Sequence, residues 1–399
     1  MKKLSMFLCL CLLIGLMTFP VSAKTLDNGL MYVIENGEAT ISNYVGKDTE
    51  IVVPAEIDGC PVTAIGGSAF ASKNVHKVTL PNTIKVIGPN AFSNCQNLKE
   101  INIPNSVTYI SDFAFDECIA LDGVILPDSL EYLGMYVFDD CSSLTKLVIP
   151  DSVKSIAYQI FGGCTSLKEV VLPKNLKKLH RRFFSGCSSL ESVVIPDSIT
   201  EIPEYTFSGC TSLKEITLPK NLQTIYYSAF AECSSLTEIV IPDTVTEIST
   251  HAFLKCTSLE RIVLSKNMKT INNCFYQCTS LKSIEIPCGV EEIAYFAFND
   301  CKALETIVFP ASITKIDEEF YYRCKSLFAV YYMGSPEKWE QMDIKLPIEI
   351  NILFPNFEQT VVEAEPTLES IMKEFYKSKL CLWRYSIWKN SRYCCVSAF

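Results

Sequence analysis

The sequence predicts an α/β-type repeat solenoid, in which about 12 repeats each add one strand to a curved parallel β-sheet. Three columns of recurring residues predict this fold. Cysteines recur every 23 residues from Cys95 to Cys256, and prolines keep the same step from Pro81 to Pro242. Phenylalanines follow the same step from Phe92 to Phe253, and the next repeat is one residue shorter. A fixed period of this length is typical of stacked supersecondary units.

The first half of each repeat is expected to form a strand. In one repeat the apolar residues Leu98, Ile101 and Ile103 recur, and the last two are separated by one polar residue, as in a half-buried strand. Pro104 follows at once and cannot donate to a strand ladder, so the strand should end there. Two residues after each proline slot stands a small polar residue that can satisfy backbone groups in a turn. These residues are Ser106, Ser129, Ser152, Asn175, Ser198, Asn221, Thr244 and Asn267.

The second half of each repeat is expected to return the chain and to place Val, Ile, Ala, Phe and Cys side chains inside. One repeat of this size cannot bury its apolar face alone. Stacked copies bury these faces against one another, so we expect one continuous core running through the repeats.

The repeat motif is similar to a known family. The stretch L-x-x-I-x-I-x-x-[SNT] resembles the leucine-rich-repeat core. The 23-residue period, the strand-ending proline and the A-F-x-x-C stretch resemble the BspA-like class of these repeats, over roughly residues 28–357. The resemblance implies a secreted or cell-surface bacterial protein. A strict asparagine column is missing, which weakens any inference from other leucine-rich-repeat receptors.

The chain divides into five predicted segments. Residues 24–72 form an N-terminal cap with a hairpin around Asn36-Gly37, and residues 73–333 form the repeats. Residues 334–357 form a C-terminal cap, in which Trp339 covers the last coil. Solenoid ends need such caps because an open end would expose the core. Residues 1–23 and 358–399 lie outside the repeat pattern.

The first 23 residues are expected to be a secretory signal peptide. Lys2 and Lys3 precede a short apolar run, and Val21-Ser22-Ala23 ends it as a small-residue cleavage site. A transmembrane anchor fits less well because the run is short and contains Pro20. No later stretch is long and apolar enough to span a membrane, so we expect no transmembrane segment after cleavage.

The tail, residues 358–399, has three open interpretations. Its last part is basic and contains Trp383 and Trp388, as a segment touching the cell envelope would be. Its apolar residues between Leu368 and Tyr376 show helical spacing, as a helix docking on the last coil would. The third interpretation, which we favour, is a tail that packs nowhere.

The cysteine column also has three interpretations. A metal site needs convergent ligands, whereas each of these cysteines stands alone in its repeat. Disulfides between neighbouring coils fit in distance, but the side chains of a stacked column run parallel. We favour small buried hydrophobic side chains. The cysteines outside the column are the more reactive candidates, namely Cys60, Cys288, Cys381, Cys394 and Cys395.

Composition and motifs argue against nucleic-acid binding and catalysis. The formal net charge is −10, whereas sequence-independent nucleic-acid binding needs a basic surface. No motif of a hydrolase, zinc protease or nucleotide-binding enzyme occurs, and His76, His180 and His251 fall at different repeat slots. We therefore predict no enzyme, no cofactor and no metal. A secreted hydrolase is the least favoured alternative.

The residue between the two isoleucines of each strand should face solvent on the concave sheet, because side chains alternate along a strand. In the middle of the chain this slot is almost entirely β-branched, and contiguous exposed apolar residues usually mark interaction sites. High β-propensity alone would also favour branched residues there. The predicted binding surface consists of Ile125, Val148, Val171, Val194, Thr217, Val240 and Val263, with the neighbouring charges Lys146, Glu169, Glu215, Glu238 and Arg261.

Two other surfaces are alternatives. Aromatic residues recur between the isoleucine and phenylalanine slots, where they either stack as structure or form an interface. They are Tyr136, Tyr158, Tyr205, Tyr226, Tyr227 and Tyr295. A basic patch on this acidic chain could meet an anionic partner such as a sulfated glycan or an acidic protein. It comprises Lys174, Lys177, Lys178, Arg181 and Arg182.

The sequence therefore predicts a non-enzymatic, adhesin-like protein that binds a protein or an extended peptide. Host matrix and another cell's surface are both candidate sources of that partner. The structural alternative is a spacer or scaffold of the bacterial cell surface.

Overall fold

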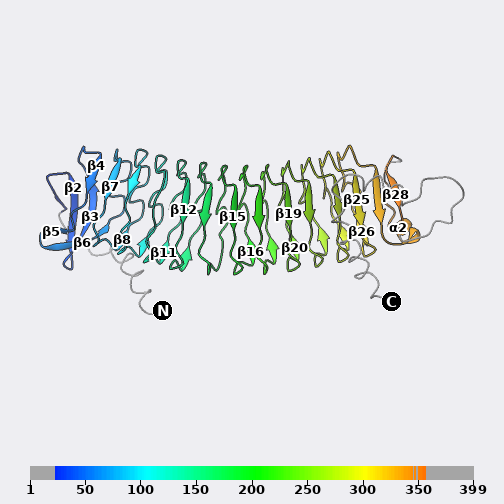
Figure 1. The fold of residues 1–399 in the computed structure, drawn as a ribbon, viewed down its shortest axis with the longest axis horizontal. Helices are drawn as coiled ribbons and strands as arrows, with labels where there is room; N and C mark the ends of the chain where they lie inside the picture. Colours follow the sequence, from blue (N-terminus) through cyan, green and yellow to red (C-terminus); the bar gives the residue numbers. More distant parts are fainter. Residues whose placement is uncertain (1–22, 345, 347–348, 356–399) are drawn as a thin grey trace. The chain divides into compact units, whose positions relative to one another are not determined.

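The computed structural model describes residues 23–344, 346 and 349–355. The chain divides into two compact units between Leu176 and Lys177. Both units are parallel β-solenoids; they contain about 14 turns, and a single short α-helix lies among the described residues. Within each unit, successive turns stack side by side (Figure 1). The predicted repeat solenoid is confirmed, and tight turns rather than helices return the chain.

An antiparallel hairpin opens the first unit. It joins β2 (Leu30–Glu35) to β3 (Glu38–Tyr44), and β1 (Lys24–Thr25) pairs with the outer edge of β2. The hairpin turn is left-handed at both Asn36 and Gly37, with φ of 52° and 78°, as a two-residue hairpin turn requires. β3 then pairs in parallel with β6 (Cys60–Ile65), which starts the solenoid, and β5 (Glu56–Ile57) pairs with the start of β6.

The predicted strand forms the first ladder of each unit, but the ladder is broken into short sheets. In the first unit these sheets are β4 (Glu50–Val52), β7 (Lys77–Thr79) and β9 (Glu100–Ile101), then β12 (Lys146–Val148) and β14 (Glu169–Val171). In the second unit they are β15 (Ser192–Val194) with β17 (Glu215–Thr217), β19 (Glu238–Val240) with β21 (Arg261–Val263), and β23 (Ser283–Glu285), β25 (Thr306–Phe309), β27 (Ala329–Tyr332) and β28 (Asn351–Leu353).

A second ladder, which the sequence did not predict, runs along the return segments. Its strands have two residues each, too few to show an alternating pattern. In the first unit they follow β6 as β8 (Val86–Ile87), β10 (Tyr109–Ile110), β11 (Tyr132–Leu133) and β13 (Ser155–Ile156). In the second unit they are β16 (Glu201–Ile202), β18 (Thr224–Ile225) and β20 (Glu247–Ile248), then β22 (Thr270–Ile271), β24 (Glu292–Ile293) and β26 (Lys315–Ile316).

One turn of the first unit lacks a strand in the first ladder. The segment 122–126 lies between the turns of β9 and β12, and Gly123 stands where neighbouring turns have Glu or Lys. Within the described part of the chain, no hydrogen bond involves the backbone of residues 123–126. The turn before this segment is instead joined to its own predecessor by a side chain. The Asn102 amide accepts a hydrogen bond from the Leu80 N–H and donates one to the Leu80 carbonyl.

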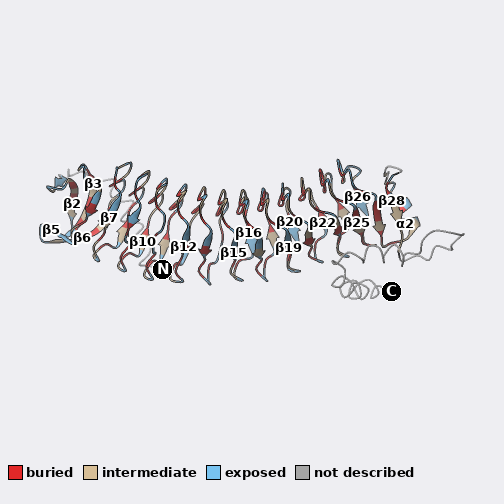
Figure 2. Cartoon of the chain, turned by 45° about the horizontal axis from the view of Figure 1, so that its top comes forward, coloured by how far each residue is buried: buried red, intermediate tan, exposed pale blue. Residues whose placement is uncertain are grey.

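Stacked phenylalanine rings fill the core. From Phe70 to Phe161 in the first unit, successive ring centroids lie 5.0 to 6.2 Å apart and the rings are nearly parallel. From Phe184 to Phe298 in the second unit the distances are 5.2 to 5.8 Å. The buried and exposed residues alternate along the first-ladder strands, so one strand face covers this core (Figure 2).

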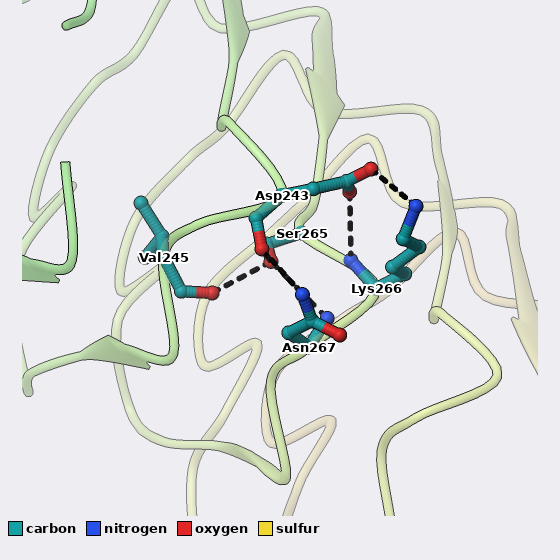
Figure 3. A network of polar contacts seen from close by, with 5 residues as sticks. All are labelled: Asp243, Val245, Ser265, Lys266 and Asn267. Carbon is teal, nitrogen blue, oxygen red and sulfur yellow. Dashed lines mark hydrogen bonds and ion pairs between the residues drawn. The ribbon is translucent and has the colours of Figure 1, made fainter. Parts of the chain in front are cut away.

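A polar network replaces the proline that one turn lacks. Ser265 occupies the proline slot and is fully buried, and its hydroxyl donates to the Val245 carbonyl at 2.6 Å (Figure 3). The amide of Asn267 donates to the Asp243 carbonyl at 2.7 Å, and Lys266 pairs with the Asp243 carboxylate. Ser106, Thr244 and Asn267 bond the previous turn, so the predicted small polar column joins neighbouring turns.

The second unit ends on the helix α2 (Pro336–Gln341) and the strand β28. The Ser335 side chain accepts a hydrogen bond from the Lys338 N–H and caps this helix. Trp339 is buried, with its ring 5.2 Å from that of Tyr332 and 6.4 Å from that of Phe309. The helix thus places a large aromatic side chain against the last strands of the ladder. The predicted signal peptide and tail (358–399) fall outside the described residues, apart from Ala23.

Candidate functional site

In the first unit the predicted binding residues occupy the same outward slot of three successive turns, with Val148 and Val171 on strands and Ile125 in the segment that forms no strand. Ile125 is 85% exposed, Val148 48% and Val171 44%. Val148 and Val171 are direct partners in the β12–β14 pair. Beside them Lys146 and Glu169 form an ion pair with an Nζ–Oε1 distance of 2.9 Å. We name Ile125, Val148 and Val171 the first valine stripe.

The second unit carries a matching surface. Val194 is 75% exposed and Val240 is 55% exposed, and each faces a partner from the next turn, Thr217 and Val263. Arg261 and Glu238 form an ion pair at 2.7 Å, while Glu215 lies exposed on β17. We name Val194, Thr217, Val240 and Val263 the second valine stripe. Val263 is half-buried, so the stripe becomes less exposed toward β21.

The predicted edge aromatics lie on the return side of the turns, where many of them contact one another. In the first unit the Tyr136 ring stacks on Phe113 at 4.7 Å and meets Tyr158 edge-on at 5.4 Å. In the second unit Tyr205 meets Tyr227 at 5.4 Å, and Tyr295 contacts Phe296 and donates to Glu319. The pKa of Tyr226 is raised, chiefly by the charge of Glu201, with burial and then the charges of Glu247 and Glu204 adding to the effect.

The predicted basic patch is divided by the unit boundary. Lys174 belongs to the first unit, where it pairs with Asp151 at 3.6 Å. Lys177, Lys178, Arg181 and Arg182 belong to the second unit. The Arg182 guanidinium lies 4.9 Å from the centre of the Tyr205 ring. His180 is half-buried, and burial followed by the nearby Lys178 lowers its pKa. It therefore adds little positive charge near neutral pH.

The cysteine column is buried, as favoured from the sequence, and it also forms a hydrogen-bond ladder. Cys118, Cys141 and Cys233 are free thiols with no exposed surface. Each donates its S–H to the carbonyl of a core phenylalanine in the previous turn, as Cys233 does to Phe207 at 3.2 Å. Burial raises the pKa of the Cys95 and Cys256 thiols to about 12, so these groups stay protonated. Cys60 and Cys288 lie nearer the surface, and the other three reactive candidates, Cys381, Cys394 and Cys395, fall outside the described residues.

The described residues contain no group of three or more potential metal ligands. His76, His180 and His251 come from turns that are not neighbours in the chain. Among the described residues there is also no helix long and apolar enough to cross a bilayer. What the two units do present are exposed columns of apolar, aromatic and charged side chains.

Two aspartates with raised pKa values were not identified as candidate residues from the sequence. Asp116 and Asp139 occupy the same slot in neighbouring turns of the first unit and are partly buried. Burial, with a smaller contribution from Glu117, raises the pKa of Asp116 to about 6. Burial also raises the pKa of Asp139 to about 7; the hydrogen bond from Gln159 opposes this rise, and the charge of Asp140 adds to it. The 23-residue step between the two aspartates was visible in the sequence. Their burial was not, because they sit in turns.

Comparisons with known proteins agree with this architecture. The family described as BspA type leucine rich repeat region (6 copies) matches residues 63–191, 134–260 and 251–341. No curated protein matches the chain.

Solved bacterial structures resemble the chain over most of its length. A leucine rich cell surface protein from Faecalibacterium prausnitzii is 28% identical over 82% of this chain and 98% of its own, with a TM-score of 0.53. A leucine-rich repeat protein from Bacteroides ovatus is 26% identical over 83% and 99%, with a TM-score of 0.60. The pneumococcal vaccine antigen PcpA, 20% identical over 84% and 94% with a TM-score of 0.52, shares the fold. The family match covers most of the chain, so the protein belongs to the BspA-type leucine-rich-repeat family.

Proposed function

We propose that this protein is a non-enzymatic, adhesin-like binding protein, exported to the outside of a bacterial cell, whose valine stripes contact a protein or an extended peptide. One observation carries the proposal: branched apolar side chains stand exposed in neighbouring turns of each unit, most of all Ile125 and Val194. Contiguous exposed apolar residues are uncommon on monomeric proteins and usually mark interaction sites.

Strand propensity does not account for this choice of residues. Threonine has a similar preference for strands and keeps a polar group in water. Thr217 shows that the slot accepts it. Ile125, Val148 and Val171 therefore leave apolar surface in contact with water. A partner that covers this surface would gain a binding free energy of about 25 cal/mol for each Å² buried.

The neighbouring charges would select the partner. Lys146 and Glu169 in the first unit, and Glu238 and Arg261 in the second, form exposed ion pairs beside the stripes. Such rim charges change the association rate and exclude partners of the wrong charge pattern, while adding little net affinity. A protein or peptide with apolar side chains flanked by charges fits this arrangement.

The binding test uses charge placed in each stripe separately. Val148→Lys with Val171→Lys changes the first stripe, and Val194→Lys with Val240→Lys changes the second. Ser155→Lys and Gln223→Lys add lysine at exposed positions elsewhere on the same two units and serve as controls. Binding is measured on surfaces coated with host matrix proteins or with other bacteria, and circular dichroism checks the fold.

We expect at least one stripe variant to lose binding while both controls keep it. Undiminished binding by both stripe variants would reject the stripes as the contact surface. A chain that binds none of these surfaces would favour the spacer interpretation. Export is tested by probing medium, wall and membrane fractions of a culture for the chain; retention in the cytoplasm would contradict the proposal.

A further inference from the structure

Two residues of most turns adopt the left-handed backbone conformation. One precedes the ladder cysteine, and there glycine, asparagine or aspartate is common, as at Gly209, Asn94 and Asp140. The other stands two positions before the core phenylalanine. We name this second set the edge column. Among the described residues it contains no glycine with positive φ, and it includes Phe113, Tyr136, Arg182, Tyr205, His251 and Phe296, with φ of 55° to 60°.

Bulky residues in the edge column are costly for the backbone. A left-handed residue with a Cβ costs about 1 to 2 kcal/mol, which glycine avoids. The cysteine-side position of the same turn holds glycine at Gly163, Gly186 and Gly209, and longer residues such as Glu117 and Lys255 in other turns. Strain retained at a position is a reason to look for a role of its side chain.

In the second unit the edge column and its neighbours form a continuous row of rings. Tyr205 meets Tyr227 at 5.4 Å with the rings inclined at 74°, and Tyr227 meets His251 at 5.5 Å and 60°. The Tyr227 hydroxyl lies 3.3 Å from Nδ1 of His251, whose ring lies 6.1 Å from that of Tyr276. We name Arg182, Tyr205, Tyr227, His251 and Tyr276 the edge strip.

The Arg182 end of the strip is positively charged. Arg182 lies over the Tyr205 ring, and both Arg182 and Arg181 lower the pKa of Tyr205 against the larger effects of burial and Tyr227, which raise it. Lys177 and Lys178 are exposed nearby in sequence and form no ion pair within the described residues. Lys214, in contrast, pairs with Glu191 of the previous turn. The acidic residues Glu201, Glu204 and Glu247 lie on the Tyr226 side of the strip.

We propose that the edge strip binds an anionic polysaccharide, with successive sugar rings lying on successive turns. The ring centroids lie 5.4 to 6.1 Å apart, so the strip offers a ligand one ring in each turn. The Tyr227 ring is exposed and can offer apolar surface to the C–H face of a sugar. The Tyr227 hydroxyl and the His251 ring can exchange hydrogen bonds with sugar hydroxyls.

The arginines account for the anionic part of the ligand. A guanidinium pairs with a sulfate or a carboxylate through two parallel hydrogen bonds. Arg182 is held over Tyr205, so its orientation is already restricted before a ligand arrives. An acidic peptide would also pair with these arginines, but a peptide backbone has no flat apolar ring to place on the aromatic ring of each turn.

The test measures binding of the full chain to immobilised heparin, which carries sulfates, and to hyaluronan, which carries only carboxylates. Dextran serves as the neutral glycan and poly-glutamate as the acidic peptide. We expect retention on at least one anionic glycan, loss of retention near 1 M salt because charges are then screened, and no retention on dextran. Retention on heparin alone assigns a sulfated ligand, and retention on both assigns either anionic group.

Variants locate the site. Arg182→Gln and Tyr205→Ala should each weaken glycan binding by about tenfold. Arg323→Gln is the matched control, because Arg323 lies 5.2 Å from the Tyr322 ring in the same unit but is paired with Asp300. Tyr132→Ala removes a stacked ring in the first unit and is the second control. Both controls should bind as the unchanged chain does.

Three results would overturn the proposal. The first is no retention on either anionic glycan. The second is an equal loss of binding in the control variants, which would make the effect structural. The third is release from heparin by poly-glutamate as readily as by free heparin, which would reduce the strip to a site for acidic peptides.

Discussion

The buried and exposed columns of this repeat have the same 23-residue spacing but follow different rules. The buried phenylalanine and cysteine slots keep one residue type over many turns, because Phe207 must stack on Phe184 and Phe230 and each ladder cysteine must reach a carbonyl of the previous turn. The outward slots change from Val171 to Thr217, and both residues remain in paired strands. Burial therefore sets residue identity inside, whereas the outside is available for recognition, and changes to the two should have separable effects.

The largest expected effect is inside. Phe207→Ala removes a ring that is stacked on both sides and has no exposed surface. We expect the free energy of unfolding to fall by about 3 to 5 kcal/mol. Urea unfolding followed by circular dichroism measures it. Tyr227→Ala, at a partly exposed ring, is the control and should cost less than about 1 kcal/mol. Equal losses would contradict the distinction between the columns.

The cysteine ladder should give the next largest effect. Cys233→Ala removes a buried side chain and its bond to Phe207, whose carbonyl still accepts the Cys210 N–H. We expect a loss of about 1 to 3 kcal/mol, and no measurable loss for the exposed Cys288→Ala. Because burial raises the pKa of the Cys233 thiol, iodoacetamide should leave it unmodified until the chain unfolds. Rapid alkylation of the folded chain would show that the turn opens.

Asp139 should give a smaller, pH-dependent effect. The folded chain favours its protonated form, since its pKa rises from 3.8 to about 7. The stability that this group contributes is therefore present below about pH 4 and is lost as the pH rises through 7. Asp139→Asn should raise the free energy of unfolding by about 1 kcal/mol near pH 8 and leave it unchanged near pH 4. A gain that is independent of pH would reject this explanation. Asp122→Asn, at an exposed aspartate, is the control.

The smallest expected effect is on the valine stripes. Val148→Thr and Val240→Thr keep the branched shape, so the free energy of unfolding should change by less than about 0.5 kcal/mol. Partner binding should nevertheless weaken, because the hydroxyl makes desolvation less favourable. A stability loss comparable to that of Cys233→Ala would show that these side chains support the fold rather than recognition.

Much of the architecture could be predicted because the inward phenylalanine, cysteine and leucine columns repeat over many turns. The spacing alone was enough to predict that Phe115, Cys118 and Leu121 lie in the core, and all three are fully buried. The second ladder could not be predicted, because a strand such as Tyr109–Ile110 is too short for an alternating pattern. The outward direction of Val148 and Val240 follows from strand alternation. The contacts among edge aromatics depend on left-handed turns at Tyr136 and Tyr205, a conformation that these residue types do not suggest.

The missing strand pairing at residues 122–126 has a mechanical consequence. In a parallel ladder pulled along its stacking direction, the load passes through the hydrogen bonds and packing that join one turn to the next. Residues 123–126 contribute no backbone hydrogen bond to that connection. The turns on either side are joined by the second ladder, by edge bonds such as that from the Phe115 N–H to the Val137 carbonyl, and by the buried side chains of Leu121, Val124 and Leu126. When the chain is stretched along the stacking direction, the first unit should yield at this turn first. Opening of this turn would lengthen the chain while the hydrogen-bonded turns on either side remain folded.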